Sequence, residues 1–91
     1  MEELLKELIE AVEIDDATAT EELLQAGADP NGSEDWAGLT PLHFAAQANA
    51  LQSAQLLLKA GANPAFRTAD GMTPFDVAHI HAHPYMISLL W

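Results

Sequence analysis

The chain has 91 residues, which is enough for one small domain. It contains no cysteine, and this excludes a disulfide scaffold, a cysteine nucleophile and a thiolate metal site. Its 14 Asp and Glu residues outnumber its 3 Lys and Arg residues, giving a formal charge of −11 that excludes the basic surface needed to bind nucleic acid or an anionic membrane. At 49% hydrophobic residues it is too apolar for a disordered acidic tail, so we expect a folded, acidic domain.

The N-terminal sequence MEELLKELIEAVEIDD has neither the basic start nor the apolar run of a signal peptide. Elsewhere the longest apolar stretches, such as Leu56-Leu57-Leu58, last about one helical turn. A membrane-spanning helix needs about 20 apolar residues. We therefore expect a cytoplasmic, intracellular protein with no membrane partner.

Apolar residues of the first segment recur at the spacing of one helix face. The residues that form this stripe are Leu4, Leu5, Leu8, Ile9 and Val12. Glutamates occupy the other faces of this predicted helix and give it a polar outer coat. Asp15 and Asp16 are expected at a turn, and a second helix carrying Leu23 and Leu24 is expected to end before Gly27.

The rest of the chain alternates between glycine turns and Thr-Pro pairs. Gly61 follows Leu-Leu-x-Ala, as Gly27 does, and predicts a helix that ends in a left-handed residue. Thr40-Pro41 and Thr73-Pro74 predict helix starts, because threonine can cap a helix and proline needs no amide donor at the first position.

Two words recur along the sequence. GLTPLHFA begins at Gly38 and GMTPFDVA at Gly71, 33 residues later, while LLQAGADPN and LLKAGANPA recur 34 residues apart. A period of 20–50 residues indicates stacked repeats. Within one domain, the repeats are expected at about residues 1–34, 35–67 and 68–91. Antiparallel second helices are expected at about Leu51–Lys59 and Pro84–Trp91.

These words resemble the ankyrin repeat family, through G-x-TPLH-x-AA at 38–46, LLKAGAN at 57–63 and GADPN at 27–31. The resemblance implies an all-α solenoid of stacked helix-turn-helix repeats with short β-turn fingers. It also implies a protein–protein interaction module, adaptor or inhibitor, without catalysis or a cofactor. The sequence departs from the family at the turns between helices, where Asn49-Ala50 and Ala82-His83 replace the usual Gly-His.

The resemblance further implies a concave binding surface built from fingertips and inner helices. The partner-binding positions it predicts are Ile14, Trp36, Leu39, Gln47, Arg67, Asp70, Met72, Ile80 and His81. Large apolar side chains gathered on a wet surface usually mark a contact. The alternative is that Leu39 and Met72 pack under the fingers and that Trp36 covers the next helix. The charge of −11 favours a protein partner with a basic surface.

Histidines are the remaining candidates for chemistry. His43 could act as a general base, but no nucleophile accompanies it, and the resemblance implies instead that its ring ties one turn to the next. Asp76, His79 and His83 share a helix face and could hold Zn²⁺ or Ni²⁺ in a sensor or enzyme. Against a metal, a fourth ligand is missing and His83 precedes Pro84, where the helix is expected to have ended.

The C-terminal segment is almost entirely apolar, whereas a terminal repeat normally has a polar outer face. Met86, Leu90 and Trp91 are therefore predicted to form an interface with a second copy. Such a structural homo-oligomer is the third interpretation of the sequence, beside the binding module and the metal site.

Overall fold

The computed structural model describes residues 2–34 and 36–91, and these ranges contain helices, turns and loops but no β-strand. Its helices are α1 (Glu2–Glu13), α2 (Ala17–Gln25), α3 (Pro41–Ala48), α4 (Leu51–Lys59), α5 (Pro74–Ile80) and α6 (Pro84–Leu90). Met1 and Asp35, the predicted first residues of two repeats, lie outside the described residues. The predicted all-α solenoid is confirmed.

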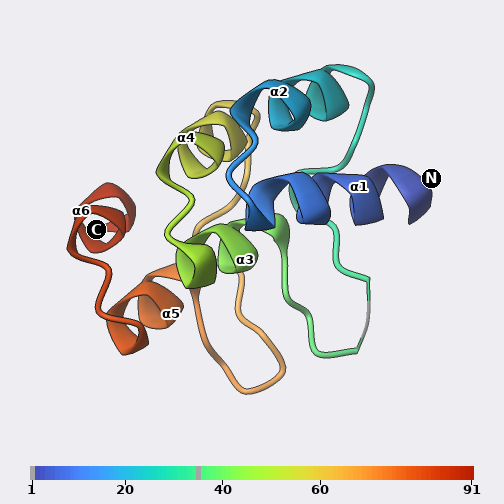
Figure 1. The fold of residues 1–91 in the computed structure, drawn as a ribbon. Helices are drawn as coiled ribbons and strands as arrows, with labels where there is room; N and C mark the ends of the chain where they lie inside the picture. Colours follow the sequence, from blue (N-terminus) through green and yellow to red (C-terminus); the bar gives the residue numbers. More distant parts are fainter. Residues whose placement is uncertain (1, 35) are drawn as a thin grey trace.

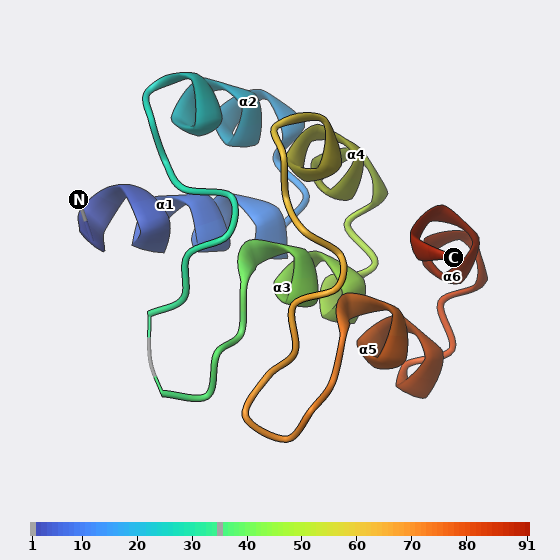
Figure 2. The ribbon, with the colours of Figure 1, turned by 180° about the vertical axis from the view of Figure 1, so that it is seen from behind.

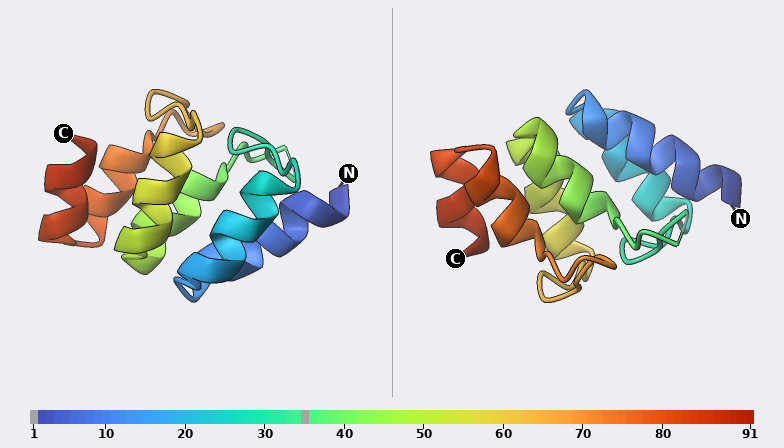
Figure 3. Two further views of the ribbon diagram at one scale, coloured as in Figure 1. Left: turned by 90° about the horizontal axis from the view of Figure 1, so that it is seen from above. Right: turned by 90° about the horizontal axis from the view of Figure 1, so that it is seen from below.

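The helices form two rows (Figure 1), with α1, α3 and α5 side by side in one row and α2, α4 and α6 in the other. The views from above and below in Figure 3 show that each helix pair follows the previous pair along the stack. Two long loops extend from the inner row (Figure 2). The first finger (residues 31–34 and 36–40) leads into α3, and the second finger (residues 64–73) leads into α5. The repeats therefore present fingers and inner helices on one side and outer helices on the other.

Small side chains let the helices approach closely. Ala45 and Ala46 on α3, and Ala50 and Ala54 around α4, are all completely buried. Leucines from each of the first two repeats complete the same core cluster. Because α3 packs against α1 on one side and α5 on the other, both neighbouring repeats shield the middle repeat from solvent.

Buried hydroxyl groups join the outer helices of the first two repeats. Thr20 on α2 and Ser53 on α4 are fully buried, and their hydroxyl oxygens lie 3.2 Å apart in a hydrogen bond. The Ser53 amide donates to the Asp15 carboxylate at 2.9 Å. The polar groups that stacking buries here thus satisfy one another, as buried polar groups must.

The inner helices begin as the Thr-Pro pairs predict. In α5 the Asp76 amide donates to the Thr73 hydroxyl at 3.2 Å, and the Thr73 amide donates to the Asp76 carboxylate at 3.0 Å, which forms a capping box. In α3 the ring of His43 takes the place of that carboxylate, and its Nδ1 accepts from the Thr40 amide at 3.1 Å.

His43 also joins two repeats. Since Nδ1 accepts a backbone N–H, the ring proton lies on Nε2, which donates to the Met72 carbonyl at 2.8 Å. The ring is fully buried, and burial is the main cause that lowers its pKa below the usual value of 6.5. These contacts agree with the structural role that the resemblance implies for His43.

The turn between the helices of each repeat contains a left-handed residue: Asp15 with φ 53°, Asn49 with φ 56° and Ala82 with φ 54°. Asparagine and aspartate tolerate this conformation, but alanine pays a steric cost because its Cβ approaches the following carbonyl. Ala82 is therefore the strained member of the three.

We expect Ala82→Gly to raise the free energy of unfolding by about 0.5–1 kcal/mol, because glycine relieves that steric cost. Urea unfolding followed by circular dichroism would measure the change. Ala60→Gly is the matched control, since Ala60 is also exposed but has an ordinary φ of −82°. The free energy of unfolding of the Ala60→Gly variant should fall by about 0.5 kcal/mol. Equal effects of the two substitutions would contradict strain at Ala82.

The lowered pKa of His43 predicts that stability falls with acidification. The unfolded chain takes up a proton near pH 6.5 while the folded chain does not, so stability is complete above that pH and declines as the pH falls toward the folded-state pKa. Urea unfolding at pH 7.5, 6.5 and 5.5 measures this slope. His43→Gln should be about 1–3 kcal/mol less stable at pH 7.5 and show a shallower slope.

Candidate functional site

The two fingers lie side by side (Figure 2) and are joined at their tips by a hydrogen bond from the Ala69 amide to the Ala37 carbonyl, 2.8 Å long. Gly38 has a positive φ of 75°, and a Cβ placed there would lie 3.6 Å from the Thr68 backbone. Glycine therefore suits the left-handed backbone conformation, while the second finger packs at ordinary contact distance. The fingers form one paired surface.

A second tie lies at the base of the fingers. The Asn31 side chain donates to the Gly61 carbonyl at 3.1 Å, and its Oδ1 accepts from the Asn63 amide at 2.7 Å. Asn31 thus bridges equivalent turns of successive repeats. Contacts of this kind fix the spacing between the fingers, so the surface they present is preorganised.

Large apolar side chains are exposed on this side of the molecule. Trp36 on the first finger is 88% exposed, Ile14 at the end of α1 is 76% exposed, and Ile80 at the end of α5 is 66% exposed. Ile14, Gln47 and Ile80 are equivalent positions of the three repeats, at or just after the C-terminal ends of the inner helices.

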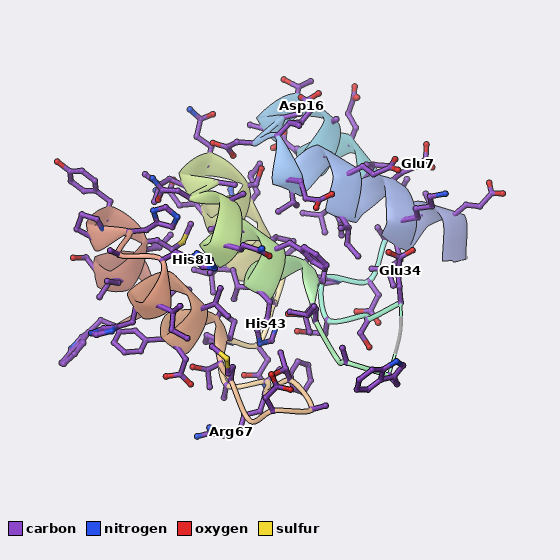
Figure 4. All side chains as sticks on the ribbon, turned by 60° about the horizontal axis from the view of Figure 1, so that its bottom comes forward. Glu7, Asp16, Glu34, His43, Arg67 and His81 are labelled. Carbon is purple, nitrogen blue, oxygen red and sulfur yellow. The ribbon has the colours of Figure 1, made fainter. Side chains whose placement is uncertain are left out.

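Exposed polar groups complete the predicted set. Gln47, Arg67, Asp70 and His81 are all exposed. Figure 4 shows Arg67 extending from the second finger and Glu34 standing on the first finger. The Arg67 guanidinium donates to the Gly71 carbonyl at 2.7 Å. This hydrogen bond holds the guanidinium against the second finger. We call the exposed residues Ile14, Trp36, Gln47, Arg67, Asp70, Ile80 and His81 the recognition surface.

Leu39 and Met72 are less exposed than the other predicted contact residues. Both are only partly exposed and line a cavity of about 100 Å³ between the fingers and α5, together with Thr68 and Val77. Met72 also packs against the core cluster. Their apolar side chains are thus partly covered by the fingers, as the packing alternative expects, and partner contact at these two positions stays a prediction.

The predicted metal ligands do not converge. The Asp76 carboxylate accepts the Thr73 amide, and this backbone hydrogen bond is the main cause that lowers the pKa of the carboxyl group. His83 Nε2 donates to the Gln47 carbonyl at 3.1 Å, while the His79 ring lies beside Phe75. Within residues 2–34 and 36–91, no three His, Cys, Asp or Glu side chains are grouped to hold a metal ion. The metal-site interpretation is therefore overturned.

The predicted interface role of Met86 is also corrected. Its side chain is completely buried within the core cluster, so it is not available to a second copy. Leu90 is partly exposed and Trp91 is 93% exposed, as an interface would require. The burial of Met86 could not be predicted from the sequence, because a short helix that is apolar on all sides gives no sign of which face is buried.

Phe66 and Tyr85 are exposed aromatic residues that the sequence analysis did not identify. Phe66, 41% exposed, lies on the second finger directly before Arg67, and its position in the AFRT segment was the available signal. Tyr85, 76% exposed, lies on α6, where it occupies the position of Gln52 in the preceding repeat.

An open hollow of about 260 Å³ lies between the outer helices α2 and α4. It is lined by Glu21, Leu24, Gln25, Leu56, Lys59 and Ala60. This hollow is on the row of helices opposite the fingers and contains none of the predicted site residues. Across the described part of the chain, no helix is both long and apolar enough to cross a membrane.

Comparison with known proteins places this architecture. Residues 8–91 match a family described as ankyrin repeats in three copies. The chain is 47% identical over 73 residues to the mouse 2-5A-dependent ribonuclease, covering 80% of this chain and 10% of that protein. It is 48% identical over 62 residues to human neurogenic locus notch homolog protein 4, and the match covers 67% of this chain and 3% of that protein.

The human ARF GTPase-activating protein GIT1 is 36% identical over 81 residues, which cover 89% of this chain and 11% of that protein. The chain thus spans about a tenth or less of the length of these relatives. The likeness is confined to the matched segments and says nothing of the rest of these proteins. With its stacked helix pairs, paired fingers and matching residues, the chain belongs to the ankyrin repeat family.

Proposed function

We propose that the chain binds a protein partner across the recognition surface and performs no catalysis. Ankyrin repeats indicate a protein–protein interaction module. The observation that carries the finer proposal is the exposure of Trp36, Ile14 and Ile80 on a surface whose spacing is fixed by hydrogen bonds between repeats. Exposed aromatic and aliphatic side chains on a rigid support are the usual anchors of an interface.

The structural roles of two chemical candidates favour binding over catalysis. Both nitrogens of the buried His43 are occupied by backbone groups, and the Asp76 carboxylate is committed to a helix cap. A general base needs an accessible site within reach of its substrate. A binding surface, in contrast, needs only complementary shape and chemistry.

The charge distribution supports a basic partner. The exposed faces of α1 carry Glu3, Glu7, Glu10 and Glu13, and the whole chain has a formal charge of −11. An acidic protein attracts a basic partner at long range and speeds its encounter. The apolar residues of the recognition surface would then supply most of the binding free energy after contact.

We expect the double substitution Trp36→Ala and Ile80→Ala to weaken binding at least about tenfold, since each side chain is an exposed anchor. A partner is first isolated with the parent chain as bait and identified by mass spectrometry. Its dissociation constant is then measured with purified proteins. Circular dichroism should be unchanged, because both side chains are mostly solvent-exposed.

Tyr85→Ala is the matched control. Tyr85 is as exposed as Ile14 but lies on the outer helix α6, away from the fingers. It should bind with the affinity of the parent chain. Equal affinity of the double variant and the parent chain would contradict the recognition surface.

A basic partner also predicts a strong salt dependence of association. Between 50 and 500 mM NaCl, we expect the association rate constant to fall at least about tenfold while the dissociation rate changes little. Stopped-flow fluorescence or surface plasmon resonance would measure both rates. An association rate that is independent of salt would contradict electrostatic attraction, although binding through the apolar residues could persist.

A further inference from the structure

The cavity between the two fingers and α5 lies within the recognition surface. It has a volume of about 100 Å³, and its lining residues are Ala37, Leu39, Thr68, Asp70, Met72 and Val77. We call this space the finger hollow. Its lining includes the exposed Asp70 of the second finger, so the hollow reaches solvent beside a residue of the recognition surface. A partner that covers the recognition surface would therefore also cover the mouth of the finger hollow.

The finger hollow exists because the third repeat has a smaller side chain than the second at one helix position. Val77 lies 33 residues after Phe44, and each is the fourth residue of its inner helix. The Phe44 side chain packs against the core cluster. Valine has no ring to reach as far, so space remains between Val77 and the fingers. The hollow is thus a property of these particular residues and not of every repeat.

The size and lining of the hollow favour an aliphatic side chain. Leu39, Met72 and Val77 are apolar, and the Thr68 hydroxyl already accepts the Met72 amide at 3.2 Å. A protein cavity of about 150 Å³ holds a benzene ring. A hollow of about 100 Å³ is too small for an aromatic side chain and suits a valine, leucine or isoleucine.

The charges around the hollow favour a basic neighbour for that aliphatic side chain. Within the part of the chain that the structure describes, no hydrogen bond or ion pair engages the exposed Asp70 carboxylate. Arg67 does not line the hollow, and its guanidinium is bound to the Gly71 carbonyl. Glu34 adds an exposed acid on the first finger (Figure 4). A lysine or arginine beside the inserted side chain would therefore meet complementary charge, in line with the formal charge of −11.

We propose that the finger hollow receives a valine, leucine or isoleucine side chain from an exposed segment of the protein partner, with a lysine or arginine of the same segment against Asp70. This inference rests on the proposed function, because it names the partner residues that the recognition surface selects. Leu39 and Met72 would then contact the partner from inside the hollow, while Trp36 contacts it from the exposed finger.

NMR titration with blocked pentapeptides tests the hollow directly. The reference peptide has a central leucine with two lysines on each side, and the comparison peptides have a central glycine or phenylalanine in the same frame. We expect the leucine peptide to shift the amide signals of Ala37, Thr68 and Asp70. The glycine peptide should bind at least about tenfold more weakly, because it leaves the hollow empty. The phenylalanine peptide should also bind more weakly than the leucine peptide, since its ring exceeds the hollow.

Val77→Phe is the sharpest variant, because it gives α5 the residue that α3 carries at the equivalent position and fills the hollow. It should remain folded by circular dichroism and bind the leucine peptide no better than the glycine peptide. Asp70→Asn should weaken the leucine peptide about two- to fivefold at low salt. Glu34→Gln is the matched control and should have a smaller effect, since Glu34 is also an exposed finger acid but does not line the hollow.

Several results would overturn the proposal. These are equal affinity of the leucine and glycine peptides, no shift of the hollow amides by any peptide, and an unchanged preference for leucine in folded Val77→Phe. Equal binding of a leucine peptide flanked by glutamates would overturn the role of Asp70. If Val77→Phe is unfolded, the comparison of peptides on the parent chain decides the outcome.

Failure of the hollow is distinguishable from failure of the recognition surface. A partner that loses affinity for the Trp36→Ala and Ile80→Ala double variant but keeps it for Val77→Phe would contradict the hollow alone. A partner that Val77→Phe weakens at least about tenfold, while the double variant binds normally, would support the hollow and contradict the exposed anchors.

Discussion

Close packing of α3 against α1 and α5 is the contact on which the rest of the structure depends. A single helix pair has apolar residues on the two faces that meet neighbouring repeats, and it cannot shield them from solvent alone. Completely buried alanines bring the neighbouring backbones near enough for Leu8, Leu42 and Leu57 to form one core. The same closeness brings Thr20 to Ser53 and His43 to the Met72 carbonyl, so the polar ties between repeats follow from the apolar packing.

Function follows from this geometry because stacking leaves three different surfaces. The fingers and inner helix ends carry apolar anchors on a preorganised frame, which suits recognition of another protein. The α1 end is acidic and stays in water, as expected of a capping helix. The α5–α6 end carries the Phe75 and Trp91 rings, and α6 has no charged side chain. The three surfaces therefore differ in chemistry, and the proposed binding uses the first of them.

Much of the fold could be predicted because its signals are local or periodic. The Thr-Pro pairs marked the starts of α3 and α5, and the 33-residue repetition of GLTPLHFA gave the stacking. The site was less predictable because burial is not a local property. The pattern of the sequence suggests that Leu39 and Met72 are exposed fingertips, yet both are only partly exposed beside one hollow, and Met72 packs against the core. Met86 lies on α6 and Trp91 directly follows that helix, and the packing of α6 on the neighbouring helices decides which of the two is buried.

Native-state hydrogen exchange is the most direct test of the claim that the middle repeat holds its neighbours together. Measured on dilute protein, the amides of α3 and α4 should be the slowest to exchange and should report a single global opening. Amides of α1, α2, α5 and α6 should exchange faster, through opening of the two ends. Slower exchange in α1 or α5 than in α3 would contradict the account, because a terminal repeat would then be stable without the contact made by the middle one.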